Sequence, residues 1–154
     1  MGFSKKGSTS YAMATARIAV GVMFLFFAQY KLFSSEFAHG GYAKYVSSYA
    51  NETAVSYYRP FLHLTLRHPV ASGYAVAIAE ALIGLSMFLG LWVRPFSVVG
   101  ALFMLNLTLC TWWRVPHGSA YWHFLGNELD NIPLMFLFII FFAHSAGQTL
   151  GLDS

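Results

Sequence analysis

Charged side chains are scarce in this chain of 154 residues. Asp, Glu, Lys and Arg together make up 10% of it, against about 25% in a typical soluble domain. Hydrophobic residues make up 57% of the sequence, and they gather in four apolar blocks. This composition excludes an ordinary soluble domain and indicates a multi-pass membrane protein surrounded by the lipid bilayer.

Several kinds of functional motif are also missing. The net charge of +3 is small and scattered, which excludes a nucleic-acid-binding protein. Cys110 is the single cysteine, so neither an intramolecular disulfide nor a CxxC redox pair can form within one chain. The sequence contains no phosphate-binding loop, nucleophile triad or dinucleotide fingerprint. No self-contained catalytic or electron-carrier motif is therefore expected, and whether the chain acts as an enzyme stays open.

The four apolar blocks predict an all-α membrane protein, a four-transmembrane-helix bundle that forms one domain over residues 1–154. A helix of about 20 residues spans the hydrocarbon core of a bilayer at a rise of about 1.5 Å per residue. The expected helices are about 11–33, 73–93, 95–113 and 130–147. Four crossings place both termini on one side of the membrane. The Lys and Arg residues divide almost evenly between the two sides, so the N-terminal cluster alone favours termini inside.

The segment 34–72 is too long for a simple turn and is expected to form a structured cap loop. Tyr42, Tyr45, Val46 and Tyr49 follow helical spacing, which predicts a short amphipathic helix lying at the membrane interface. A second short helical piece is expected at 57–66, interrupted by Pro60.

Glu80 is the only acidic or basic residue within the second apolar block before Arg94. An ionised carboxylate at the centre of a membrane helix costs roughly 2.5–3.5 kcal/mol, so Glu80 should be paired, protonated or close to water. A stripe of small residues beside it allows another helix to approach closely: Gly73, Ala77, Ala81 and Gly84. Glu80 is therefore expected to face the bundle rather than lipid.

Counting from the helix ends brings polar groups of all four helices to a similar depth. The expected cluster contains Glu80 as the catalytic carboxyl and four ligand-binding candidates, Gln29, Lys31, Asn106 and Asp130. Arg94 is a fifth ligand-binding candidate. Two interpretations stay open: a Glu80–Lys31 ion pair that only locks helix packing, and a site for a proton or a polar headgroup. For Lys31, as for Arg17, a third interpretation is an anchor whose ammonium or guanidinium reaches the headgroups.

The six histidines could suggest haem or a metal. Only His144 falls on an expected membrane helix, where it lacks a histidine partner for axial ligation. His39, His63 and His68 fall in the cap loop, and His117 and His123 in the second loop, without Cys or acidic ligands at zinc-like spacing. No metal site and no intrinsic cofactor are predicted.

The sequence resembles the DoxX/DoxD-like family of membrane proteins over roughly residues 11–153. The resemblance is carried by the pattern Glu80-x3-Gly84-x5-Gly90-Leu-Trp-Val-Arg94 and by Gly21 followed by Gln29-Tyr30-Lys31. A C-terminal Leu-Asp pair of that family is matched by Leu152-Asp153. The resemblance implies a four-helix protein of a bacterial or archaeal inner membrane.

The same resemblance implies a function linked to quinone. Members of this kind include the small membrane subunit of thiosulfate:quinone oxidoreductase and components of quinone-connected or oxidative-stress complexes. The first hypothesis is therefore an integral membrane subunit of a quinone-linked redox complex, with other protein subunits as partners and quinone as the ligand near Glu80. The alternative is a non-catalytic accessory subunit that packs against a larger respiratory or photosynthetic complex.

Overall fold

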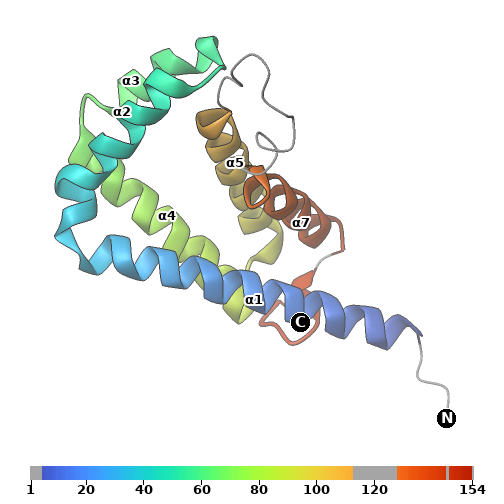
Figure 1. Cartoon of the computed structure of the whole chain (residues 1–154). Helices are drawn as coiled ribbons and strands as arrows, with labels where there is room; N and C mark the ends of the chain where they lie inside the picture. Colours follow the sequence, from blue (N-terminus) through green and yellow to red (C-terminus); the bar gives the residue numbers. More distant parts are fainter. Residues whose placement is uncertain (1–4, 113–127, 145, 154) are drawn as a thin grey trace.

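The structure, a computed structural model, describes residues 5–112, 128–144 and 146–153, and the secondary-structure elements in these ranges are all helices. Their arrangement is shown in Figure 1. In chain order the elements are α1 (Lys5–Phe33), η1 (Phe37–Gly41), α2 (Tyr42–Glu52), η2 (Ser56–Tyr58), α3 (Arg59–Thr65), α4 (Pro69–Leu89), α5 (Val93–Thr111), α7 (Asn131–Ala143) and η3 (Ala146–Gln148).

Three helices have the length and apolarity needed to cross a bilayer: Thr9–Phe33 within α1, Pro69–Leu89 and Val93–Thr111. They correspond to the first three expected helices. The fourth expected helix, 130–147, is shorter than predicted. Its helical part is α7 with 13 residues, which at 1.5 Å per residue reaches roughly 20 Å. Membrane-type helices are therefore confirmed, whereas the count of four crossing helices is not.

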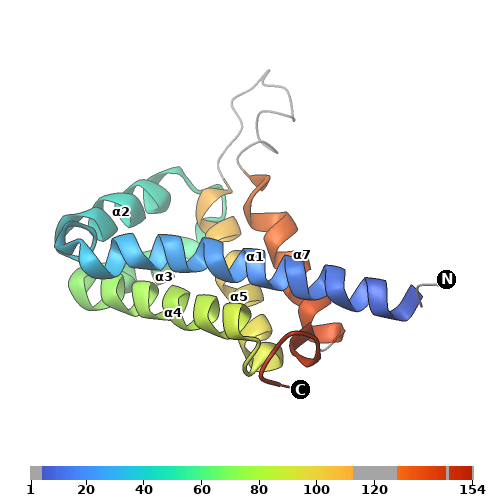
Figure 2. The same cartoon turned by 90° about the horizontal axis from the view of Figure 1, so that it is seen from below.

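Helices α1 and α4 run antiparallel in close contact along most of their length (Figures 1 and 2). Glycines permit this approach from both sides. A side chain at Gly21 would meet the Phe88 backbone nitrogen at 2.5 Å, and one at Gly84 would meet Leu25 at 2.9 Å. Gly73 and Ala77, also predicted for the small-residue stripe, are buried as well. The stripe thus packs α4 against α1 and η1.

The second pair, α5 and α7, crosses behind the first (Figure 2). The core between the pairs is apolar and aromatic. Phe138 of α7 is fully buried, and its ring makes edge-to-face contacts with Phe24 of α1 and Phe141 of α7. Burying large aromatic side chains in this way excludes gaps between the helices and contributes dispersion energy.

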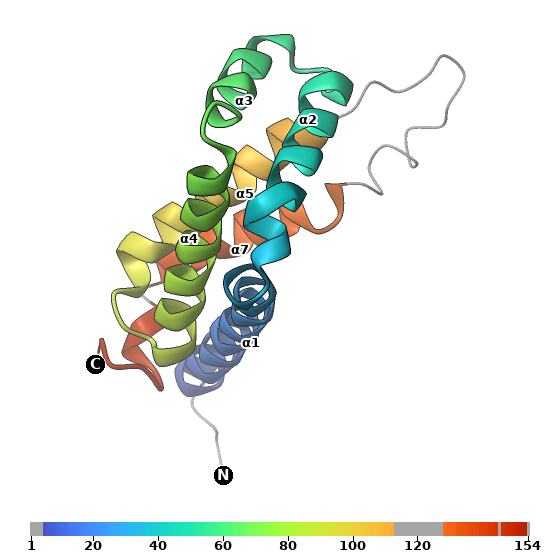
Figure 3. The same cartoon turned by 90° about the vertical axis from the view of Figure 1, so that its left-hand side faces the viewer.

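The segment between α1 and α4 folds into a helical cap, but the cap ends before residue 72, because α4 begins at Pro69 and not at the expected residue 73. Figure 3 shows α2 and α3 side by side beyond the end of α1, with α3 leading into α4. Tyr42, Val46 and Ala50 form the buried face of α2. The cap is tied to the far end of α5, because Thr53 Oγ1 donates to the Leu109 carbonyl at 2.8 Å. Pro60 occupies the first turn of α3, where proline is well tolerated. The predicted interruption at Pro60 is therefore the beginning of a helix.

Arg17 is not the headgroup anchor that the sequence suggests. Its side chain is 0% exposed. One guanidinium nitrogen donates to the Met87 carbonyl at 2.6 Å, and another donates to the Leu150 carbonyl at 2.8 Å. Because α1 packs so closely on α4, the guanidinium is enclosed between the end of α4 and the C-terminal segment.

The C-terminal segment 146–153 closes the turn between α4 and α5. Asp153 accepts hydrogen bonds from the backbone N–H groups of Trp92 (2.7 Å) and Val93 (2.8 Å) at the start of α5. The Asp153 N–H in turn donates to the Gly90 carbonyl at 2.9 Å. A carboxylate at a helix N-terminus satisfies free N–H groups and interacts favourably with the helix dipole.

We expect Gly90→Ala to destabilise the protein strongly. Gly90 ends α4 with a φ of +67°, and a Cβ there would overlap the Arg17 guanidinium and the Gly151 backbone. The left-handed conformation alone costs a residue with a side chain roughly 1–2 kcal/mol. The apparent melting temperature in detergent should fall by several degrees. Gly41→Ala is the control, because Gly41 has a right-handed helical φ of −58°; an equal loss in both variants would contradict this explanation.

We expect Asp153→Ala to release the C-terminal segment. The change removes both acceptors from the start of α5 and should cost about 1 kcal/mol, as for other helix-capping side chains. Hydrogen–deuterium exchange should become faster in 89–93 and 146–153 and stay unchanged in the cap. Gln148→Ala, at an exposed position in the same segment, should leave the exchange as in the parent chain. Unchanged protection in Asp153→Ala would show that the carboxylate does not hold the segment.

Candidate functional site

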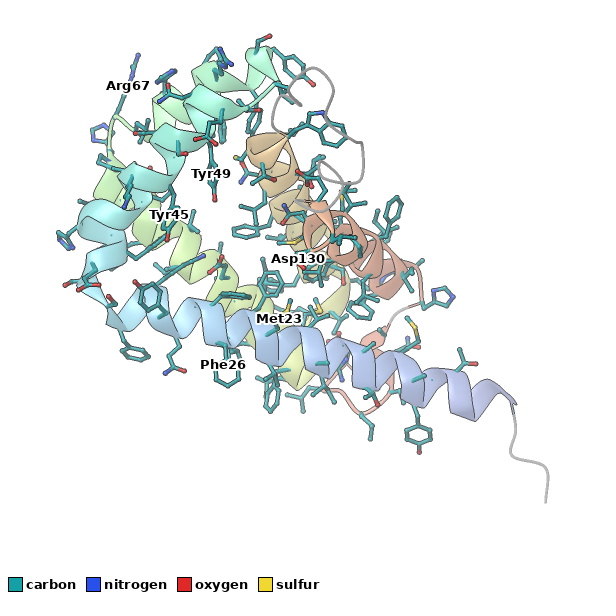
Figure 4. The ribbon with its side chains drawn as sticks, in the orientation of Figure 1. Met23, Phe26, Tyr45, Tyr49, Arg67 and Asp130 are labelled. Atoms are coloured by element: carbon teal, nitrogen blue, oxygen red, sulfur yellow. The ribbon has the colours of Figure 1, made fainter. Side chains whose placement is uncertain are left out.

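A cavity of about 330 Å³ lies between the cap and the helices α4 and α5. Most of its walls are apolar or aromatic. Figure 4 shows Tyr45 and Tyr49 on the side of α2 that faces this space, whereas Arg67 points away from it. The lining residues are Tyr30, Lys31, Phe37, Tyr42, Tyr45, Val46, Tyr49, Phe61, Leu62, Thr65, Val76, Glu80, Phe103, Asn106, Leu107 and Cys110. A concave apolar pocket with a few convergent polar groups is typical of a small-molecule site.

The ion pair of Lys31 and Glu80 is the polar centre of this cavity. Lys31 Nζ lies 2.5 Å from Glu80 Oε1 and donates a hydrogen bond to it. The Glu80 side chain is 6% exposed and that of Lys31 is 20% exposed. The second carboxylate oxygen, Glu80 Oε2, is buried and has no hydrogen-bond partner among the residues described. Glu80 therefore faces the bundle, and one of its two carboxylate oxygens has no partner among the described residues.

Lys31 is held in place by an aromatic ring as well as by its counter-ion. Its ammonium nitrogen lies 5.1 Å from the centroid of the Phe37 ring, in cation–π geometry. Phe37 belongs to η1, the short helix that turns the chain from α1 into the cap. Lys31 comes from the last turn of α1, so the start of the cap fixes the direction in which this side chain points.

Asn106 is held by a residue that the sequence did not single out. The Tyr58 hydroxyl donates a hydrogen bond to Asn106 Oδ1. Burial is the main reason why the pKa of Tyr58 is raised to about 12, and the nearby Cys110 and Tyr42 raise it further. The hydroxyl thus keeps its proton at physiological pH and acts as the donor. Because Oδ1 is the atom engaged, the amide nitrogen Nδ2 remains available for another acceptor.

Three predicted site residues meet at the cavity, and three do not. Glu80, Lys31 and Asn106 line it together. Gln29 is exposed on the outer side of α1, beside Phe26 and Phe33. The reason is the helix period, which turns Gln29 away from the face that carries Lys31. The expectation of one cluster that includes Gln29 is therefore wrong.

Asp130 and Arg94 also lie outside the cavity. Asp130 precedes α7 and is exposed. Figure 4 labels its position. Arg94 is exposed at the opposite end of α5, where its guanidinium carbon lies 5.1 Å from the centroid of the Phe142 ring. The counted depth did not bring Asp130 into the cluster, because α7 packs on the side of α5 away from the cap.

A second buried carboxylate, Glu128, was missed as a site candidate. It is 1% exposed, and its Oε1 accepts a hydrogen bond from the Thr111 hydroxyl at 2.9 Å. The Asn131 amide nitrogen lies 3.5 Å from its Oε2. The sequence signal that could have found it is the polar second half of the third apolar block, because polar side chains such as Thr111 need a hydrogen-bond partner when they are buried. Glu128 does not line the cavity. Its carboxylate instead links Thr111 of α5 to Asn131 of α7.

The histidines were not expected to bind a metal. Within the described ranges no three His, Cys, Asp or Glu side chains converge as a metal site. His63 and His68 are exposed, and His39 Nδ1 lies 3.0 Å from the Ser35 carbonyl oxygen. His117 and His123 fall outside the described residues.

The arrangement of the cavity defines what it can do chemically. An ammonium and an amide can donate hydrogen bonds, and a carboxylate can accept a hydrogen bond or a proton. Rings of Phe37, Tyr42 and Phe103 can pack against a flat apolar molecule. Tyr45 and Phe61 are 56% and 46% exposed, so part of the cavity lining reaches the surface of the protein.

Comparison with known proteins places this site within a family. A sequence profile of the DoxX family matches residues 12–113. This match covers most of the first membrane-type helix, the other two, the cap, and Lys31, Glu80 and Asn106 of the cavity. No curated protein and no solved structure matches the chain. Since the profile covers more than half of the chain and the helices have membrane-type length and apolarity, the protein belongs to the DoxX family.

Proposed function

We propose that this protein binds a quinone in the cavity beneath the cap and acts as a membrane subunit of a quinone-linked redox complex. The observation that carries the proposal is the ion pair of Lys31 and Glu80 on the wall of an otherwise largely aromatic cavity. Quinones combine a flat apolar ring with two carbonyl oxygens. The ring matches the walls, and the oxygens match the donors.

The residues present fit such a ligand in three respects. The volume of about 330 Å³ suits a substituted ring. Lys31 and Asn106 supply hydrogen-bond donors, and the unpartnered oxygen of Glu80 offers a place for a proton. The exposed rings of Tyr45 and Phe61 provide an opening through which an apolar tail reaches the surface of the protein.

The protein's own residues would orient the ring and handle protons. Lys31 and Asn106 donate hydrogen bonds to ring oxygens, while Glu80 takes up or releases a proton beside them. The surrounding aromatic side chains exclude water and strengthen these interactions. A bound quinone supplies two-electron redox chemistry, and a partner subunit would exchange the electrons.

The alternative, an accessory subunit without a quinone site, has a different basis. Phe26, Phe27, Tyr30 and Phe33 are all exposed along α1, and Figure 4 shows Phe26 pointing away from the other helices. Such a surface suits lipid and a neighbouring subunit equally. Contact with a partner through this face is compatible with a ligand in the cavity.

Filling the cavity should remove the quinone. In Val76→Trp the indole enters the cavity from α4, because Val76 is a partly buried lining residue. Ile78→Trp is the matched control, since Ile78 lies two residues further along α4 and is 50% exposed. Quinone extracted from gently solubilised, purified protein should be present in the parent chain and in Ile78→Trp and absent from Val76→Trp. Equal amounts in both variants, or none in the parent chain, would reject the quinone site.

Replacing the carboxyl group of Glu80 should slow quinone turnover while the protein still folds. In Glu80→Gln the amide keeps an oxygen that accepts from Lys31 but has no exchangeable acid proton. Positioned acids and bases contribute typically 10²–10⁴-fold to a rate, so quinone reduction by membranes that contain the complete complex should fall by about that factor. Yield and melting temperature of the variant serve as the folding control. Parent-like turnover in a folded variant would exclude a role for Glu80 in proton transfer.

A further inference from the structure

The wall of the cavity carries an unused hydrogen-bond acceptor. Glu80 Oε1 accepts from Lys31, whereas Glu80 Oε2 is buried without a partner among the residues that the structure describes. A carboxylate paired with an ammonium group is an acceptor only. Because leaving such a buried oxygen unpartnered costs free energy, a ligand that donates a hydrogen bond to it gains affinity.

The donors on the same wall have a fixed direction. The Tyr58 hydroxyl donates to Asn106 Oδ1, so the amide nitrogen is the atom of this side chain left to donate to a ligand. Lys31 uses one of its three N–H bonds for Glu80. Around Glu80 the described part of the wall thus offers the Lys31 ammonium and the Asn106 amide nitrogen as donors, and Glu80 Oε2 as an acceptor without a partner.

The two redox forms of a quinone differ in whether they can donate a hydrogen bond to Glu80. The oxidised form has two carbonyl oxygens, which only accept hydrogen bonds, and would leave Glu80 Oε2 without a partner. The hydroquinone has two hydroxyl groups, each of which donates one hydrogen bond and accepts others. One hydroxyl can donate to Glu80, while its own oxygen or the second hydroxyl accepts from Lys31 or Asn106.

On the basis of the proposed quinone site, we infer that the cavity binds the hydroquinone form more tightly than the quinone form and that Glu80 determines this preference. Sites built to hydrogen-bond a ligand hydroxyl discriminate strongly against analogues that lack it. The inference goes beyond quinone binding, since it states which redox form the protein holds and which residue selects it.

A preference of this kind changes the redox potential of the bound pair. Tighter binding of the reduced form stabilises that form and raises the midpoint potential relative to free quinone. For a two-electron couple, each tenfold difference in affinity corresponds to about 30 mV. The bound pair would therefore accept electrons from a partner more readily than quinone in the lipid does.

The test is a comparison of dissociation constants for one ring in two redox forms. The purified full-length chain in detergent is titrated calorimetrically, without oxygen, with 2-decyl-1,4-hydroquinone and separately with 2-decyl-1,4-benzoquinone. We expect the hydroquinone to bind at least about tenfold more tightly. This measurement needs no variant, so it remains decisive even if a substitution prevents folding.

Three variants assign the preference to a residue. Glu80→Gln replaces the free acceptor with an amide donor and should abolish or reverse the ratio of the two constants. Asn106→Leu removes a donor that both forms use, so both affinities should fall by a similar factor and the ratio should persist. Glu128→Gln is the matched control, because it changes another buried carboxylate that does not line the cavity. Both constants should then equal those of the parent chain.

The outcomes separate this inference from the function on which it rests. Equal or tighter binding of the quinone form by the parent chain would overturn the inference and leave the quinone site intact. A preference that survives in folded Glu80→Gln would overturn the role of Glu80. Failure of both forms to bind the parent chain would reject the quinone site itself, and the inference with it.

Discussion

The close antiparallel packing of α1 on α4 is the constraint on which the rest of the structure depends. It is possible because Gly21 and Gly84 present no side chain where the two backbones meet. At one end of this contact Lys31 is brought to Glu80, and at the other Arg17 is brought to the Met87 carbonyl. Two cations that could have reached the headgroups are thereby directed into the protein, where each requires a partner.

The two ends of the contact between α1 and α4 have different properties. Around Arg17, the C-terminal segment, the turn at Gly90 and the start of α5 are joined by several hydrogen bonds to backbone groups. These bonds fix α4 relative to α5, although Arg17 Nε is buried without a partner among the described residues. Around Lys31 the pairing is incomplete, since one oxygen of Glu80 has no partner in the part of the chain that the structure describes. The two ends therefore differ in position rather than in completeness of pairing: the unpartnered atom of Glu80 belongs to a residue that lines the cavity, whereas that of Arg17 does not.

The cap converts the gap between α4 and α5 into a defined site. Its helices are short, and they are stable because Tyr42, Val46 and Ala50 are buried. The bond from Thr53 to the Leu109 carbonyl and the bond from Tyr58 to Asn106 attach the cap to α5. The same aromatic residues that stabilise the cap also line the cavity. The stability of the cap and the shape of the cavity are therefore coupled.

The sequence by itself determined the membrane class, the approximate positions of three helices long and apolar enough to span a bilayer, the helical cap and the inward orientation of Glu80. Each of these follows from local signals: apolar length, helical spacing of tyrosines, or a single acid in an apolar block. The partners of these residues were decided only by tertiary structure. Which way Gln29 points, whether Arg17 is buried, and that Tyr58 orients Asn106 depend on how helices rotate and pack against one another. A small error in rotation moves a side chain from the core to the surface, and nothing in the local sequence fixes that rotation.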